Sequence, residues 1–223
     1  ELIDCFEGYQ VHFLTGHTHN NYNVEVAGKN IFEHNVGAIC ATWWWTGKLS
    51  NNQICKDGTA GGYGIWNING NDIKWTYKAI GEKDSYQFHC YDLNKVHITA
   101  AEFVPNGSDA SKNTFELNYA VGYQNKRNDN PAWKLEVREN GLLLDYKAAV
   151  AKKDPLHIIS YEAKRLDQNN TPTSSFVTDY SSHIFELETS SPNSDLEITV
   201  TDRFGNIYKE TMKRPKDFGI LMK

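Results

Sequence analysis

Two histidines separated by one residue are the part of this chain best suited to bind a metal ion. His17 and His19 lie in the sequence Gly16-His17-Thr18-His19, directly after an apolar run that ends at Thr15. Imidazole nitrogens bind zinc, iron, manganese and nickel, and a loop that begins with glycine can direct both rings to neighbouring positions. A catalytic metal site needs at least three protein ligands, so a lone His-x-His more often marks surface or hydrogen-bonded histidines.

Other motifs that would carry chemistry are missing from the sequence. It contains no Gly-x-Ser-x-Gly elbow, no Walker loop, no dinucleotide-binding fingerprint and no Cys-x-x-Cys pair. The remaining histidines fall at wide separations, as expected for structural residues. Among them His34 is the best further candidate ligand, because it lies close to the motif in sequence.

Composition narrows the class of protein. The 223 residues carry 28 acidic and 23 basic side chains, a net charge of −5, which argues against a partner that is nucleic acid or an anionic membrane. Aromatic residues make up 13% and no apolar stretch reaches the length of a membrane span. A chain that starts at Glu1 rather than at methionine is expected to be a processed or excised piece of a longer protein.

The elements expected around the histidines are short strands. Residues 1–7 have the apolar spacing of the last turns of a helix, and a strand over 10–15 delivers the two histidines to their loop. A strand is expected over 31–40, and strands over 63–68 and 73–80 flank Asn69-Gly70-Asn71-Asp72, which predicts a hairpin turn.

Beyond about residue 82 the pattern is all β. Turn signals separate short alternating segments, which favours a β-sandwich, with an immunoglobulin-like arrangement as one form of it. A helical turn is expected over 148–153. The expected strands are 86–91, 96–103, 115–123, 133–138, 157–164, 183–188, 196–201 and 207–212.

The residues near the two histidines resemble those of a known enzyme family. An apolar strand that feeds Gly16-His17-Thr18-His19 resembles the last metal-ligand motif of the calcineurin-like metallophosphoesterases. The segment 35–47, with its run Trp43-Trp44-Trp45, and the loop 55–63, which contains Asp57-Gly58-Thr59, look like the secreted bacterial branch of that family. The resemblance implies a periplasmic or secreted protein.

The resemblance divides the chain into two parts. Residues 1–82 would be the C-terminal segment of the catalytic core, an edge remnant of its α/β fold, and residues 83–223 an all-β accessory domain. We expect this second domain to pack against the core and to shape its entrance. The fold class is therefore expected to be mainly β.

The resemblance also implies a reaction and its cofactors. His17 and His19 would bind one each of two divalent ions, manganese, iron or zinc, in a hydrolase that cleaves a phosphoester with a water bridging the metals. The family's earlier motifs, Asp-x-His, Gly-Asp-x-x-Asp and Gly-Asn-His, do not occur in these 223 residues. The N-terminal remainder of the core is thus the expected partner, and this chain alone is expected to bind no metal tightly, to hold no catalytic residue of its own and to be inactive.

The tryptophan run and the cysteines have two interpretations each. In a strand, at least one of the three indoles would pack in the core; alternatively one of them walls a substrate pocket with the glycine-rich loop, and Trp44, Asp57 and Tyr63 are the candidate pocket residues. For an exported protein of this family a Cys40–Cys55 disulfide is the candidate pairing, whereas all four cysteines could equally be buried thiols.

A second hypothesis belongs to a different functional class. Most of the chain carries no catalytic constellation and is rich in aromatic residues, as binding sandwiches are. The chain would then be a stand-alone β-rich binding module in which Gly16-His17-Thr18-His19 is inert.

Overall fold

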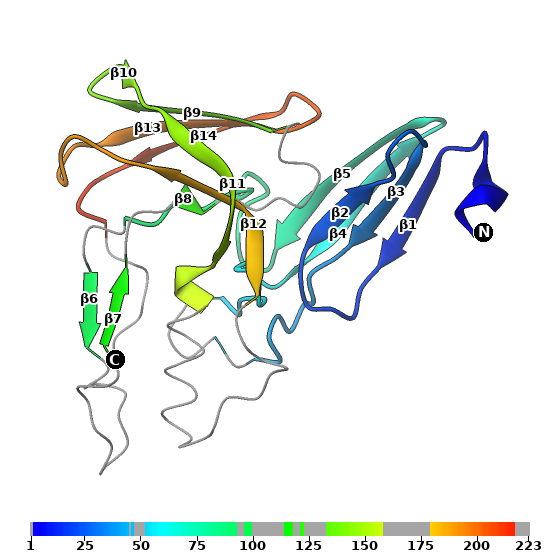
Figure 1. Cartoon of the computed structure of the whole chain (residues 1–223), viewed down its shortest axis with the longest axis horizontal. Coiled ribbons are helices and arrows are strands. Elements are labelled where there is room, and N and C mark those ends of the chain that lie inside the picture. Colours follow the sequence, from blue (N-terminus) through cyan, green and yellow to red (C-terminus); the bar gives the residue numbers. More distant parts are fainter. Residues whose placement is uncertain are drawn as a thin grey trace, which may run out of the picture.

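The computed structural model confirms a mainly β fold (Figure 1). It describes residues 2–44, 46, 52–92, 96–99, 114–117, 121–122, 133–157 and 179–216. The segments before residue 80 lie at one end of the molecule and the sheet of β9, β13 and β14 lies at the other (Figure 1). No helix in these described segments is long and apolar enough to cross a membrane.

The N-terminal part is a small mixed sheet preceded by one turn of 3-10 helix. The helix is η1 (Ile3–Phe6), and the strands are β1 (Val11–Thr15), β2 (Tyr22–Glu25) and β3 (Ile31–Asn35). The sheet order is β1-β3-β2, with β1 parallel to β3 and β2 antiparallel to it. The strand expected over 31–40 therefore ends at Asn35.

The predicted hairpin is confirmed. Strands β4 (Gly62–Asn69) and β5 (Asp72–Ala79) pair antiparallel along their whole length, with Asn69 opposite Asp72. Gly70 adopts a φ of 58° in the turn between them, a conformation that glycine reaches without steric cost.

The C-terminal part contains the remaining strands of the described chain. They are β6 (Val96–Thr99), β7 (Thr114–Leu117), β8 (Val121–Gly122), β9 (Lys134–Glu139), β10 (Leu142–Leu143), β11 (Tyr146–Lys153), β12 (Tyr180–Leu187), β13 (Leu196–Thr201) and β14 (Ile207–Met212). The main sheet has the order β10-β9-β13-β14, a second has the order β11-β12-β8, and β6 pairs with β7.

Alternating apolar residues of the main sheet form the core of this part. Leu135 and Val137 of β9, and Leu196, Ile198 and Val200 of β13, all point to one buried face. Phe185 and Leu187 of β12 belong to the same cluster, so the two sheets share one core. An immunoglobulin-like form of this packing stays a prediction.

Two local predictions were wrong. Residues 148–153, expected as a helical turn, belong to β11, which pairs with β12 through two register irregularities. Residues 86–91 hold no strand. A helical turn covers 155–157, and the rest of the strand expected over 157–164 lies outside the described residues. Pairing with a distant strand decided the first case, since Tyr146-Lys147-Ala148-Ala149-Val150 has no strong β pattern of its own.

Contacts cross the boundary predicted near residue 82. Arg203, in the turn between β13 and β14, places its guanidinium 5.0 Å from the ring centre of Trp75 and lies 3.6 Å from the Glu25 carboxylate. The ring of Phe204 meets Trp75 edge to face at 4.9 Å. The predicted packing of the β-rich part against the N-terminal part agrees with these contacts, while the division into two domains stays a prediction.

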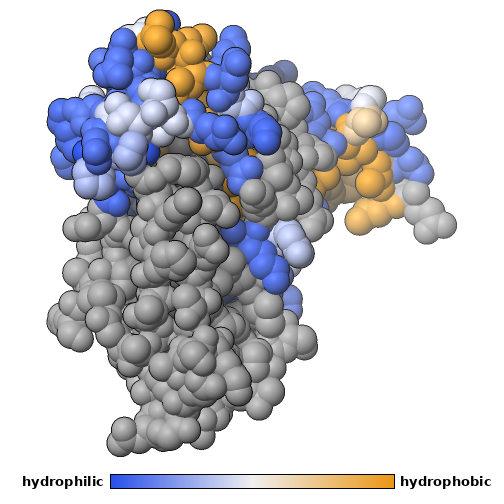
Figure 2. Space-filling model, turned by 60° about the vertical axis from the view of Figure 1, so that its left-hand side comes forward, coloured by the Kyte–Doolittle hydropathy of each residue, from blue (hydrophilic) through white to orange (hydrophobic). Residues whose placement is uncertain are grey.

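The described surface is mostly hydrophilic and carries separate apolar areas (Figure 2). One lies at the top, at the height of β10 in Figure 1, where Leu142 and Leu143 are exposed. Large exposed apolar side chains also occur near the N-terminus, at Leu2, Tyr9 and Leu14.

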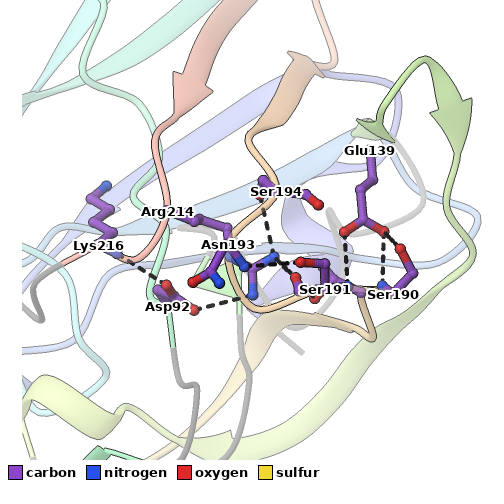
Figure 3. Close-up of polar contacts among 9 residues, drawn as sticks. Asp92, Glu139, Ser190, Ser191, Asn193, Ser194, Arg214 and Lys216 are labelled. Carbon is purple, nitrogen blue, oxygen red and sulfur yellow. Dashed lines mark hydrogen bonds and ion pairs between the residues drawn. The ribbon is translucent and has the colours of Figure 1, made fainter.

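A buried ion pair fastens the loop between β12 and β13 (Figure 3). The Arg214 guanidinium lies 3.4 Å from the Asp92 carboxylate, and both side chains are about fully buried, at 1% and 2% exposure. Arg214 also donates to Thr189 Oγ1 and to the carbonyl of Ser191.

The same loop is also held by a carboxylate (Figure 3). Glu139 accepts hydrogen bonds from the backbone N–H and the hydroxyl of Ser190 and from the N–H of Ser191. The bond from the Ser190 N–H is the main reason why the pKa of Glu139 lies below its ordinary value.

Replacing Arg214 by alanine is expected to lower the free energy of unfolding by about 3–5 kcal/mol, because it leaves the Asp92 charge buried and unpaired. Lys213→Ala is the control, since Lys213 pairs with Asp195 at the surface and its removal is expected to leave stability nearly unchanged. Urea unfolding measures both values, and equal effects of the two substitutions would contradict the assignment.

Candidate metal site

The two histidines of the motif lie in a strained loop at the end of β1. His17 has a φ of 79° and His19 a φ of 58°, both in the left-handed region that residues other than glycine seldom adopt. His17 is exposed, and His19 is partly buried. The sequence predicted a strand that ends in this loop, and β1 (Val11–Thr15) confirms that arrangement.

A buried asparagine on the neighbouring strand holds this loop. Thr15, the last residue of β1, is paired with Asn35, the last residue of β3. The Asn35 side-chain amide donates to Thr18 Oγ1 at 2.6 Å and to the carbonyl of Asn20 at 2.7 Å. The sequence interpretation missed this role, because Asn35 follows two other polar residues, Glu33 and His34, and nothing in the local pattern distinguishes it.

A second strained loop, residues 38–44, meets the first at His19. The His19 Nδ1 atom is hydrogen-bonded to the carbonyl oxygen of Ala41, and its ring stacks on the Trp43 indole with 3.8 Å between ring centres. Ala41, Trp43 and Trp44 have φ values of 47°, 50° and 60°. Five of the six positive-φ residues other than glycine in the described chain therefore lie in these two loops.

The first two residues of the tryptophan run are exposed. Trp43 and Trp44 lie in a turn rather than in a strand, and their exposures are 41% and 67%. Left-handed backbone at both positions removes the alternation of a strand. Trp45 lies outside the described residues, so a core position for one of the three indoles stays a prediction.

A third loop, containing the other two candidate pocket residues, lies next to the motif. Asp57 is buried, and it accepts a hydrogen bond from the backbone N–H of Asn21 at 2.9 Å and others from the N–H and hydroxyl of Thr59 at 3.1 Å. Its carboxylate thus ties this loop to the chain that follows His19. Tyr63 is the second residue of β4 and is exposed; a pocket formed by Trp44, Asp57 and Tyr63 stays a prediction.

Residues from the C-terminal part support two of these loops. Thr42 donates to the Ile54 carbonyl at 2.8 Å and lies 3.0 Å from Nε2 of His157, which must therefore be the donor to the hydroxyl. Both of these side chains are fully buried.

Gly58 packs directly on the Asp154 side chain. A Cβ atom at Gly58 would lie 2.4 Å from Asp154 Cγ, so only glycine fits there, and Gly58 has a φ of 91°. Asp154 is itself fixed by hydrogen bonds from Tyr91 and from the His157 backbone.

Polar contacts at residue 179 also join the two parts. Asp179 accepts a hydrogen bond from the Asn20 amide at 2.9 Å, lies 3.4 Å from the Lys56 ammonium, and donates its backbone N–H to the Lys56 carbonyl. None of the residues at 154, 157 or 179 was a candidate in the sequence, because their proximity depends on the tertiary fold.

The cysteines at the site are free thiols in this structure. Cys40 Sγ lies 4.0 Å from Nδ1 of His19, and Cys55 is buried with its sulfur 3.9 Å from the Ala38 carbonyl. Burial raises the pKa of the Cys55 thiol well above its ordinary value, which disfavours the reactive thiolate. The Cys40–Cys55 disulfide stays a prediction.

His34 has a structural environment. It is buried, its Nδ1 lies 2.7 Å from Asn23 Oδ1, and its Nε2 lies 2.8 Å from Nδ1 of His12. Both ring nitrogens of His34 are thus occupied by protein partners, which leaves no lone pair for a metal ion.

The two motif histidines fit part of a metal site. Their imidazoles suit zinc, iron or manganese, and neither Nε2 has a hydrogen-bond partner among the described residues. Within the same residues no three His, Cys, Asp or Glu side chains gather closely enough to hold an ion. The described chain therefore contributes two donors and not a complete ligand set.

Comparison with known families assigns most of the chain to one family. A family model described as the C terminal of calcineurin-like phosphoesterase matches residues 33–208. The chain belongs to this family. No curated protein and no solved structure matches the chain.

The match to this phosphoesterase C-terminal region includes the 38–44 loop and the 57–59 loop, and it extends across residue 82. It begins after His17 and His19. The predicted resemblance to the C-terminal portion of such enzymes is confirmed. The N-terminal catalytic part of a calcineurin-like phosphoesterase is accordingly the partner that this region implies.

Gly58→Ala is expected to destabilise this C-terminal region more than Gly28→Ala does. Both glycines have positive φ, so each alanine adds backbone strain of about 1–2 kcal/mol, but only at Gly58 does the new methyl group collide with Asp154, which adds about 1–3 kcal/mol. Gly28 is open, with nothing within 4 Å. Thermal and urea unfolding compare the two variants, and similar losses would contradict the packing at Gly58.

Acid is expected to destabilise the fold through His157. Burial lowers the pKa of His157 to about 4, against the partly opposing effect of Asp154, Asp57 and Asp179. The unfolded chain, with an ordinary histidine pKa of about 6.5, binds a proton that the folded chain excludes, so stability falls as the pH drops from about 6.5 to about 4, by up to about 3 kcal/mol.

The His157→Gln variant isolates this effect, because glutamine can still donate to Thr42 but does not titrate. We expect its unfolding free energy to depend less steeply on pH between 6.5 and 4 than that of the wild type. Parallel pH profiles for the two proteins would show that His157 is not buried in the neutral form.

Proposed function

We propose that this chain completes the dinuclear metal centre of a calcineurin-like phosphoesterase and that His17 and His19 each bind one of its two ions. The hydrolysed bond would be a phosphoester. The observation that carries the proposal is the concentration of backbone strain at these two histidines and at the loop that contacts His19. Strained conformations of this kind cost about 1–3 kcal/mol each and cluster at functional sites.

The donor set supports the same proposal. His17 is exposed and His19 is held by its Nδ1, so an Nε2 atom of each ring is available to an ion. Bound divalent ions would stabilise charge on the phosphoryl oxygens and lower the pKa of a water. The residues of this chain would hold the ions and position them, and Asn35 would keep the histidine loop at the sheet edge.

The remaining ligands would come from the N-terminal part of the enzyme. Catalytic sites with two metals rely on carboxylates. Asp57, in the third site loop, accepts bonds from Asn21 and Thr59, and Asp154, which packs on that loop, accepts bonds from Tyr91 and His157. These two carboxylates serve the fold, so the proposal assigns the metal-binding ones to polypeptide outside these 223 residues.

The test compares the 223-residue chain with the product of the complete open reading frame that encodes it. With Mn²⁺, Zn²⁺ or Fe²⁺ added, the chain alone is expected to show no hydrolysis of p-nitrophenyl phosphate or its diester, and the complete product is expected to be active. His17→Ala and His19→Ala in the complete product should each lower activity and bound metal by more than about 100-fold, since even indirect partners of a metal change affinity by 10- to 100-fold.

Lys213→Ala is the control, because it changes an exposed side chain that pairs with Asp195 and not with a residue of the site loops. It is expected to leave metal content and activity unchanged. Full metal content in both alanine variants, or metal-dependent turnover by the 223-residue chain alone, would overturn the proposal. Binding of a glycan or protein with no metal dependence would instead favour a β-rich binding module.

A further inference from the structure

We propose that the 38–44 loop is a positioning device for His19: the Ala41 carbonyl sets which ring nitrogen carries the proton, and the Trp43 indole sets the plane of the ring. The inference rests on the proposed function, because the nitrogen that this arrangement leaves free is the one that would bind a metal ion. Ala41 and Trp43 touch His19 and not the reacting groups, so they are positioning residues.

The hydrogen bond to Ala41 determines the tautomer of His19. A backbone carbonyl can only accept, so the Nδ1 atom of His19 must carry the hydrogen. In the neutral ring Nε2 then keeps its lone pair, which is the form that a metal ion requires. A backbone carbonyl bonded to the other ring nitrogen fixes the orientation of a metal-binding histidine.

The stacked indole restricts the ring further. The His19 and Trp43 rings are 3.8 Å apart between centres, with 21° between their planes. A hydrogen bond at one atom still allows the imidazole to swing about that contact, whereas an indole against its face opposes such a movement. The two contacts together hold the direction in which Nε2 points.

The backbone of the loop is consistent with this role. Ala41, Trp43 and Trp44 all have positive φ, and the turn is closed by hydrogen bonds from Ala41 N–H to the Ala38 carbonyl and from Trp44 N–H to the Cys40 carbonyl. Three such residues within four positions store unfavourable energy that core packing would not require. The strained backbone of the loop places one carbonyl and one indole against His19.

Trp44 provides a matched comparison within the same loop. It has the same side chain and nearly the same backbone conformation as Trp43, but it is 67% exposed. Replacing Trp44 therefore tests the effect of losing an indole from this turn without removing the ring that stacks on His19.

The experiment measures the tautomer directly, without requiring activity. Long-range ¹H–¹⁵N correlation spectra of the histidine-labelled 223-residue chain show which ring nitrogen of His19 is protonated. We expect the wild type, Trp43→Phe and Trp44→Ala to have the proton on Nδ1, and Trp43→Ala to give a mixture of tautomers. Titration with ZnCl₂, followed at the same ring, is expected to give an affinity about 10- to 100-fold weaker in Trp43→Ala and unchanged in Trp44→Ala.

Two results would overturn the inference: a proton on Nε2 in the wild type, or a Trp43→Ala spectrum that matches the wild type. Far-ultraviolet circular dichroism of each variant separates a local effect from unfolding, and Trp43→Phe keeps the stacking partner if the alanine variant does not fold. The tautomer of His19 decides the role of the loop, whereas the metal content and activity of the complete product decide the proposed function.

Discussion

The parallel, in-register pairing of β1 with β3 is the constraint on which the site depends. Because neighbouring parallel strands finish at the same edge of a sheet, Thr15 and Asn35 end side by side. The buried Asn35 amide can then hold the loop that carries His17 and His19. The chain leaving β3 at that edge forms the next loop, so His19 meets a carbonyl 22 residues further along the sequence.

The strain in these two loops has to be balanced by the rest of the molecule. Left-handed backbone at alanine, histidine and tryptophan persists only where surrounding contacts leave no better conformation. Thr42 supplies such contacts through its hydrogen bonds to the Ile54 carbonyl and to His157. The close packing of Gly58 on Asp154 supplies another. The C-terminal β part thus contributes to the site by holding its loops, which gives a physical reason for a phosphoesterase to keep this region attached to its core.

Local signals predicted the parts of the fold that local sequence controls. The hairpin of β4 and β5 followed from the turn at Asn69–Asp72, and β9, β13 and β14 followed from alternating apolar residues. β2 was missed, and β11 was expected as a helical turn, because short polar or alanine-rich segments take their conformation from the strands with which they pair. The turn at Trp43 and Trp44 has no strand alternation, and Trp43 stacks on the distant ring of His19.

The sequence by itself determined the chemistry that is available: two imidazoles on a loop after an apolar strand, too few carboxylates in recognisable motifs, and a β-rich remainder. Residue type and spacing are enough for that, because ligand chemistry and strand alternation are local properties. Only the tertiary structure decided that Asn35, Ala41 and Trp43 surround the histidine loop. It also decided that Asp154, His157 and Asp179 contact this loop's neighbours. Those contacts join residues far apart in the chain, and no pattern of spacing encodes which distant carbonyl or ring will face His19.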